Sequence, residues 1–326
     1  MTQAGPRCSD AARERADPLF ATAPPAVRLL LIEVPGPWGR AGLVGSRLPD
    51  AVTRPLAAAA DAGGVRVQLL RAVGRHAVPR VPGAADGGGH SWALADPDAG
   101  VVRWGTWTAP DDLLAIDLHE RLHAGQASTG PQRLALVCTH ARHDVCCAVR
   151  GRPVAAVLAE ASDHLHRQIW ETSHLGGDRF AANVLLLPEG EVFGGLDDDT
   201  VVDVVRAVDA GRLDLTRHRG RVGRAPVVQA ALHLAALTLG DDRLGAVRAV
   251  GRPRAASGED GRISMDVVRT DRRYTVTMVE SWAPPRPLTC AALEAKPARR
   301  FALESITEIV PVADAVTDAE EDRRAG

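Results

Sequence analysis

The strongest constraint on how this chain folds is an order of predicted elements that occurs twice. The first copy opens with a continuous apolar run, typical of a buried strand. Breaker residues follow, and a segment with helical spacing then ends at a glycine pair. A second strand and a hairpin come next, and a proline beside acidic residues indicates the start of a closing helix. The predicted elements are Val27–Val34, Leu48–Ala62, Val65–Val73, Ser91–Ala95, Val101–Trp107 and Ala109–Leu118.

The second copy keeps this order, with a polar, cysteine-containing loop after its first strand. Strand, helix, strand, hairpin and helix in succession is a thioredoxin-like order, and its recurrence indicates an internal duplication. The predicted elements are Arg133–Val137, Pro153–Ala161, Gln168–Thr172, Asn183–Pro188, Glu191–Leu196 and Asp198–Val208.

The last third of the chain follows a different pattern. Ala225–Leu239 reads as an apolar helix, whereas Ser264–Trp282 and Arg300–Val312 read as strands. Arg217–Arg224 is basic and contains glycines, which favours a solvated linker. We therefore expect an α/β fold of two tandem thioredoxin-like units with a C-terminal α+β segment. The expected divisions are residues 1–124, 125–212 and 213–326.

Charge and hydropathy exclude several classes of partner. The formal net charge is −2, so no polyanion-binding surface is implied, and we expect no nucleic-acid partner. No run of about 18 apolar residues is present, so we expect no membrane partner. The start of the chain, Met1–Leu19, is polar and lacks the apolar core of a signal peptide. We therefore expect a cytoplasmic protein.

The chemistry of the chain is concentrated in its cysteines, which number five. An odd number in a long chain without a secretion signal argues against a disulfide framework. Cys147 follows Cys138 by nine positions, whereas zinc knuckles space their cysteines by two to four. A wide loop suits the larger iron–sulfur cluster. The alternative is that these are ordinary buried cysteines.

A second motif precedes the strand at Asn183–Pro188. Its residues are Ser-His-Leu-Gly-Gly-Asp, with His174 and Asp178 four positions apart. A turn can point two side chains at this spacing in the same direction, and the glycines allow tight backbone turns near a ligand. Thioredoxin-like packing would bring this loop and the cysteine loop to one end of the sheet, so His174 is a candidate metal ligand.

Together, CTHARHDVCCAVRG and SHLGGDRFAANVLLLPEG resemble the sucrase/ferredoxin-like family. Cys8-Ser-Asp, Leu29–Trp38 and Leu288-Thr-Cys290 resemble further features of its bacterial members. The resemblance implies a thioredoxin-like ferredoxin domain with a [2Fe–2S] cluster. It implies no sugar hydrolysis, since the first half of the family name is historical.

The resemblance implies ligands position by position. The family's two cysteine ligands fall on Cys138 and Cys147, and its first histidine falls on His174. Its second histidine falls on Asp178, so the expected set of two cysteines and two histidines is broken. Asp178 is the first choice for the fourth ligand because its position is inherited with the loop. Cys290 and then Cys146 are the alternatives, and loss of the cluster is another.

These residues predict an electron carrier rather than an enzyme. A neutral imidazole in place of a thiolate removes negative charge from the cluster and raises its potential. We expect one-electron transfer to or from a redox partner protein that the sequence does not identify, without an organic substrate. One alternative is a cluster-free thiol oxidoreductase that uses Cys146 or Cys147, although a C-x-x-C motif is missing. Another is a zinc-binding structural or interaction module.

Overall fold

The computed structural model describes residues 7–74, 89–125, 128, 130–255, 261–270 and 272–309. A short helix precedes the first predicted copy. The elements are α1 (Cys8–Glu14), β1 (Arg28–Glu33), α2 (Asp50–Ala62), β2 (Val65–Ala72), β3 (His90–Asp96), β4 (Val101–Trp107) and the 3-10 helix η1 (Pro110–Ala115). The predicted closing helix at 109–118 is present, as a shorter 3-10 helix. The Asp112 carboxylate accepts from the amides of Thr108 and Ala109, and the backbone is already extended at Ile116.

The second copy follows the expected order more closely. Its elements are β5 (Leu134–Cys138), α3 (Val145–Glu160), α4 (Ser162–Leu165), β6 (Gln168–Thr172), the 3-10 helix η2 (Asp178–Phe180), β7 (Val184–Leu187), β8 (Glu191–Phe193), α5 (Val201–Asp209) and β9 (His218–Arg221). The linker predicted at residues 217–224 is wrong, because β9 pairs with β8 and Arg219 is fully buried.

Nine strands of the described chain form one sheet in the order β4-β3-β1-β2-β6-β5-β7-β8-β9. In the first half β1 is parallel to β2 and antiparallel to β3, and β5 has the same relations to β6 and β7. The halves meet where β2 runs antiparallel to β6. The mixed α/β architecture is confirmed and both halves use the same strand pairing. Their assignment as thioredoxin-like units stays a prediction.

The large sheet curls so that its two halves share a core. Leu29 and Leu31 of β1 belong to the same buried cluster as Leu134 and Leu136 of β5. The ring centroids of Trp104 and Trp170 lie 6.4 Å apart. On the outer faces, α2 covers the first half, and α3 and α5 cover the second. Strands covered on both faces need apolar residues throughout, which explains the continuous runs.

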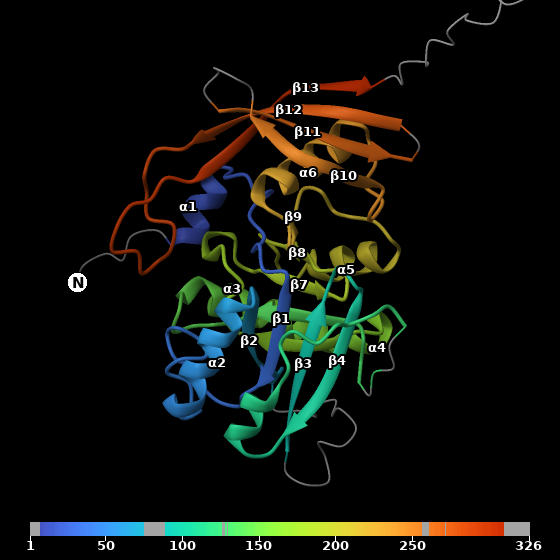
Figure 1. Cartoon of the computed structure of the whole chain (residues 1–326). Helices are drawn as coiled ribbons and strands as arrows, with labels where there is room; N and C mark the ends of the chain where they lie inside the picture. Colours follow the sequence, from blue (N-terminus) through green and yellow to red (C-terminus); the bar gives the residue numbers. More distant parts are fainter. Residues whose placement is uncertain are drawn as a thin grey trace, which may run out of the picture.

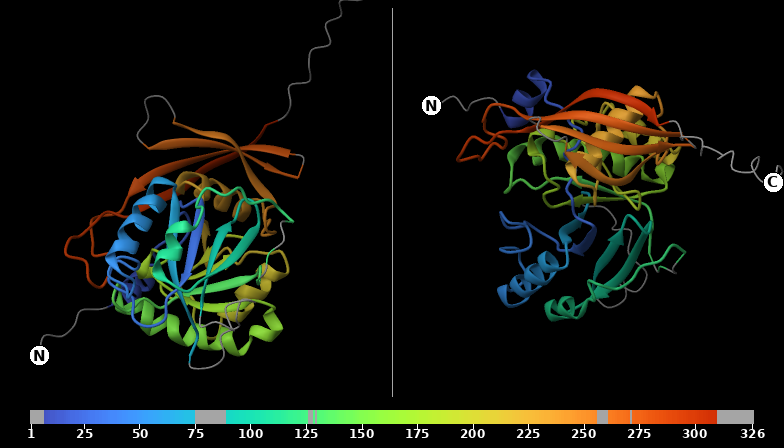
Figure 2. Two further views of the ribbon diagram at one scale, coloured as in Figure 1. Left: turned by 60° about the horizontal axis from the view of Figure 1, so that its bottom comes forward. Right: turned by 45° about the horizontal axis from the view of Figure 1, so that its top comes forward.

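The C-terminal part adds a second sheet of four described strands and one helix. The elements are α6 (Pro226–Thr238), β10 (Val247–Ala255), β11 (Arg262–Arg269), β12 (Arg272–Trp282) and β13 (Arg299–Ile309). The helix packs on one face of this sheet (Figures 1 and 2), and Leu234 shares a core with Val276 and Met278. The predicted strand at 264–282 is divided between β11 and β12. None of the helices in the described residues has the length and apolar character of a membrane span.

Candidate functional site

The candidate site lies where the parallel strands β5 and β6 end. Cys138 closes β5 and is in register with Thr172, which closes β6. Parallel strands end at the same edge of a sheet, so the loops that leave them emerge side by side. One loop leads to Cys147 in α3 and the other contains His174. The structure thus brings the two sequence motifs together.

Three of the predicted ligands form one cluster. The donor atoms of Cys138, Cys147 and His174 lie within 4.8 Å of one another. Both thiols are buried, whereas the side chain of His174 is 25% exposed. A group held by these residues would face solvent on its imidazole side and the protein interior on its thiolate side.

Asp178, which directly follows Gly176 and Gly177, lies next to this cluster. Its Oδ1 accepts from the Cys147 thiol at 3.1 Å and lies 2.9 Å from Nδ1 of His174. That nitrogen is buried, and among the described residues it has no partner in hydrogen-bond geometry. A nitrogen and a carboxylate oxygen this close form an ion pair when the imidazole is protonated, and both are atom types that bind metal ions.

Glycine and a buried arginine fix the turn that carries these two residues. Gly177 has φ +71°, a left-handed conformation, and any Cβ there would overlap the guanidinium of Arg219. Arg219 is fully buried and donates at 2.9 Å to both the Gly176 carbonyl and Asn183 Oδ1. This role of Arg219 could not be predicted from the sequence, because a basic stretch without apolar alternation gives no sign of burial.

His143 is a further candidate ligand, and it was not among the ligands predicted from the sequence. Its ring stacks on that of His174 with centroids 3.6 Å apart. Its Nδ1 donates to the Arg40 carbonyl at 3.1 Å, and its Nε2 lies 3.5 Å from Asp178 Oδ2. A hydrogen bond at one ring nitrogen that leaves the other facing the site is the usual arrangement of a metal-bound histidine. Its position between the two ligand cysteines was the available signal.

The first half of the large sheet, whose strands contain no cysteine, supports the site. Arg66 and Gln68 of β2 donate to the His174 carbonyl at 2.6 and 3.2 Å. His140 Nε2 donates to the Gly39 carbonyl at 2.7 Å. Backbone and side chains from the first half therefore hold both loops of the site in place.

The site concentrates negative charge. A hydrogen bond from Cys147 is the main cause that lowers the pKa of Cys138, and the same contact raises the pKa of Cys147. Burial alone would lower the pKa of His174, but Asp178 and Cys138 outweigh it and raise the pKa to about 9. Burial opposes ionisation of Asp178, yet His143 and His174 hold its pKa below the usual range. A thiolate next to a carboxylate favours a bound cation.

The other cysteines form a separate cluster with Asp144. Cys290 and Cys146, the alternative fourth ligands, lie here with Cys8 and not among the donors that surround His174. The hydrogen bond with Cys8, together with Ser9, lowers the pKa of Cys146 to about 6. The contact with Cys146 raises the pKa of Cys8, and burial raises the pKa of Cys290 to about 11.

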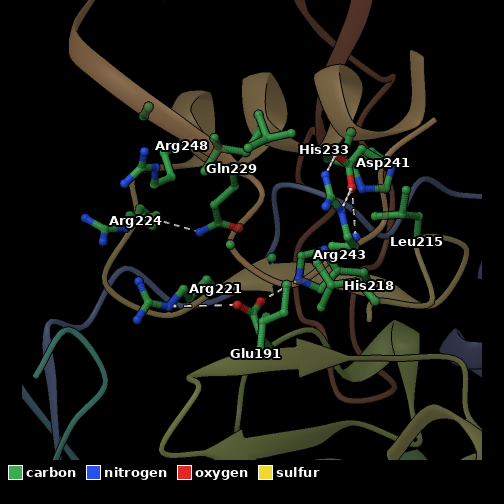
Figure 3. Close-up of a pocket in the computed structure, with 18 of the residues that line it drawn as sticks. Glu191, Leu215, His218, Arg221, Arg224, Gln229, His233, Asp241, Arg243 and Arg248 are labelled. Carbon is green, nitrogen blue, oxygen red and sulfur yellow. Dashed lines mark hydrogen bonds and ion pairs between the residues drawn. The ribbon is translucent and has the colours of Figure 1, made fainter. Parts of the chain in front are cut away.

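A pocket lies between β9, α6 and the start of β10 (Figure 3). Its walls carry His218, Arg221 and His233, and Glu191 is 2.7 Å from His218 and 3.8 Å from Arg221. Among the described residues that line it, none belongs to either cysteine cluster. We therefore take the edge of the sheet with Cys138 and His174 as the functional site.

Comparison with known proteins supports this choice. A family model described as sucrase/ferredoxin-like matches residues 44–220, which is more than half of the chain. The chain belongs to the sucrase/ferredoxin-like family. The matched region contains the whole cluster from Cys138 to Asp178, whereas Cys8 and Cys290 lie outside it. Neither the curated proteins nor the solved structures give a match.

Proposed function

We propose that this member of the sucrase/ferredoxin-like family binds a [2Fe–2S] cluster and transfers single electrons. The ligands in this proposal are Cys138, Cys147, His174 and Asp178. The observation that carries it is the convergence of two cysteines and a histidine within 4.8 Å, in a family with a ferredoxin-like name. Histidine replaces cysteine on one iron of some natural [2Fe–2S] centres.

The donor set fits the proposed group. Two thiols and one imidazole are the ligand types of such centres, and Asp178 adds an oxygen donor beside them. Nδ1 of His174 lies 2.9 Å from Asp178 Oδ1 and offers a lone pair to a metal once its proton is displaced. When bound, the cluster supplies a one-electron redox couple.

The surrounding residues favour electron transfer over substrate turnover. Buried Cys138 and Cys147 keep water from one side of the site, while His143 and His174 have exposed fractions of 30% and 25%. A redox partner protein could therefore approach on the imidazole side. The proposal includes thioredoxin-like packing of both halves and a cytoplasmic location, and it requires no organic substrate.

Metal analysis tests the proposal directly. The full chain, produced and purified without oxygen, should be brown and contain two irons and two acid-labile sulfides per chain. His174→Ala should lose iron and visible absorption together, whereas exposed His164→Ala should retain both. Unchanged absorption in His174→Ala would remove His174 from the ligand set.

Two other outcomes would replace the proposal. Zinc at the Cys138 site without sulfide would indicate a structural or interaction module. A colourless protein without metal, in which one thiol reacts much faster than the others, would indicate a thiol oxidoreductase that uses Cys146 or Cys147.

A further inference from the structure

Three cysteines that are remote in sequence meet outside the proposed cluster site. The Sγ atoms of Cys8 and Cys146 are 3.6 Å apart, those of Cys146 and Cys290 are 3.3 Å apart, and those of Cys290 and Cys8 are 3.5 Å apart. They come from α1, from the first turn of α3 and from the loop between β12 and β13. Figure 1 shows α1 next to that loop.

We propose that Cys8, Cys146, Cys290 and Asp144 form a second metal site, which binds one Zn²⁺ ion. Three thiolates and one carboxylate are a donor set that suits zinc, a borderline-soft ion that accepts both sulfur and oxygen ligands. Binding replaces the three thiol protons with the metal ion, and the protons pass to solvent.

The distances match a tetrahedral ion. A Zn–S bond of about 2.3 Å gives a tetrahedron edge of about 3.8 Å between two sulfurs, and of about 3.5 Å between sulfur and oxygen. The three sulfur pairs are only 0.2–0.5 Å shorter than that edge, at 3.3, 3.5 and 3.6 Å. The Cys8 sulfur lies 3.6 and 3.8 Å from the two Asp144 oxygens. A disulfide requires about 2.05 Å and would leave the third thiol unused.

Asp144 is held in a position to serve as the fourth ligand. Its Oδ1 accepts from the Cys146 amide at 2.8 Å and its Oδ2 accepts from the Cys290 amide at 2.6 Å. The carboxylate is buried, so its charge needs compensation. These two bonds orient the carboxylate and both cysteine backbones toward one point, as outer hydrogen bonds do at metal sites.

Hydrogen-bond donors also reach the sulfurs. Ser9 Oγ donates to Cys146 Sγ at 3.2 Å, and the Cys8 amide donates to Cys290 Sγ at 3.4 Å. Arg150 Nε in turn donates to Ser9 Oγ at 2.8 Å. Such donors stabilise thiolates, and the guanidinium offsets part of the excess negative charge of the site.

Four protein ligands leave no open position, so the ion would be structural. It would link α1 and the loop from β12 to β13 to α3, the helix that also contains Cys147. A structural zinc ion contributes its binding free energy to folding. The two sites are independent in this proposal, since they share no ligand.

Zinc analysis of paired variants tests the site. The anaerobically purified full chain should contain one Zn²⁺, with an X-ray absorption spectrum that fits three sulfurs at about 2.3 Å and one oxygen at about 2.0 Å. Cys290→Ser should weaken Zn²⁺ binding by roughly 10–100-fold or more in a chelator competition and retain iron. His174→Ala should lose iron and retain zinc. This crossed pattern separates failure of the second site from failure of the first.

Four results would overturn the second site. One is a wild-type chain that stays free of zinc when reduced and supplied with Zn²⁺. Another is a disulfide between two of the three cysteines in the anaerobically purified chain, shown by intact mass. The others are fewer than three sulfurs around zinc and an unchanged zinc affinity in Cys290→Ser.

Discussion

Cys146 and Cys147 are adjacent in the chain, yet their thiols belong to different donor clusters. The sulfur of Cys146 lies 3.3 Å from that of Cys290, whereas the sulfur of Cys147 lies 3.1 Å from Asp178 Oδ1. Successive residues of an α-helix are turned by about 100°, so neighbours in a first turn can face opposite sides. Asp144, the N-cap of α3, accepts from Cys146 N. One helix end therefore organises both clusters, and its dipole favours thiolates in each.

If the proposed cluster has Asp178 as a ligand, where the resemblance implied a histidine, its redox potential should be lower than with histidine. A carboxylate ligand keeps a negative charge that a neutral imidazole lacks, and extra negative charge stabilises the oxidised cluster. We predict that Asp178→His retains iron and raises the midpoint potential by on the order of 100 mV. Exposed Asp163→His serves as the matched control. A redox titration that gives the same potential for the wild type and Asp178→His would show that Asp178 is not a ligand.

The stacked pair of histidines allows a sharper test of the fourth ligand. Nε2 of His143 is 3.5 Å from Asp178 Oδ2, so His143 can either support Asp178 or replace it as the ligand. With Asp178 as the ligand, we predict that His143→Gln keeps its full iron content while Asp178→Ala loses iron. The reverse pattern in the iron and sulfide analysis would assign the fourth position to His143.

Sequence reasoning found the part of the site that local order determines. Cys138 ends one strand and His174 follows its parallel neighbour, so a strand–helix–strand order was enough to bring these residues together. Apolar runs without alternation likewise predicted strands covered on both faces. The resemblance to the family, and not the loop spacing, implied that Cys147 is the second cysteine of this edge.

Contacts between residues far apart in the chain could not be predicted from the sequence. Cys8 and Cys290 are 282 positions apart, and no periodicity links them. The curl of the sheet depends on contacts such as that of Trp104 with Trp170, which come from different halves. The burial of Arg219 depends on partners from three other segments, namely Thr22, Gly176 and Asn183. Polar residues of this kind look solvated until their partners are known.

The contact between α3 and the end of β5 predicts that a side chain at Gly151 destabilises the protein. A Cβ at this position would overlap the carbonyl oxygen of Cys138. Alanine gains about 1 kcal/mol of helix propensity over glycine, but overpacking against backbone costs about 1–3 kcal/mol. We predict a net loss of stability in Gly151→Ala, with weaker iron retention because Cys138 is displaced. The unfolding temperature and the iron content should both be lower than in the exposed control Arg152→Ala. Wild-type values for both would show that the helix can shift without affecting the site.

The pocket of Figure 3 contains a histidine whose neutral form is favoured by the fold. His233 is 9% exposed, stacks on Phe20 with centroids 4.5 Å apart and lies near His218, with ring centroids 6.3 Å apart. Burial, with a smaller contribution from His218, lowers the pKa of His233 to about 4. In the unfolded chain this histidine has an ordinary pKa of about 6.5. As the pH falls, it is therefore protonated in the unfolded chain before it is protonated in the folded protein.

This difference in pKa predicts a measurable loss of stability in mild acid. The contribution of His233 is fully present above about pH 6.5 and decreases as the pH falls toward 4, by about 2 kcal/mol between pH 8 and pH 5. We predict that His233→Phe, which keeps the ring stacked on Phe20, reduces the drop in unfolding temperature between these pH values. Loss of the exposed imidazole in His164→Gln should leave the drop unchanged. An equal drop in wild type and His233→Phe would mean that protonation of His233 does not destabilise the folded protein.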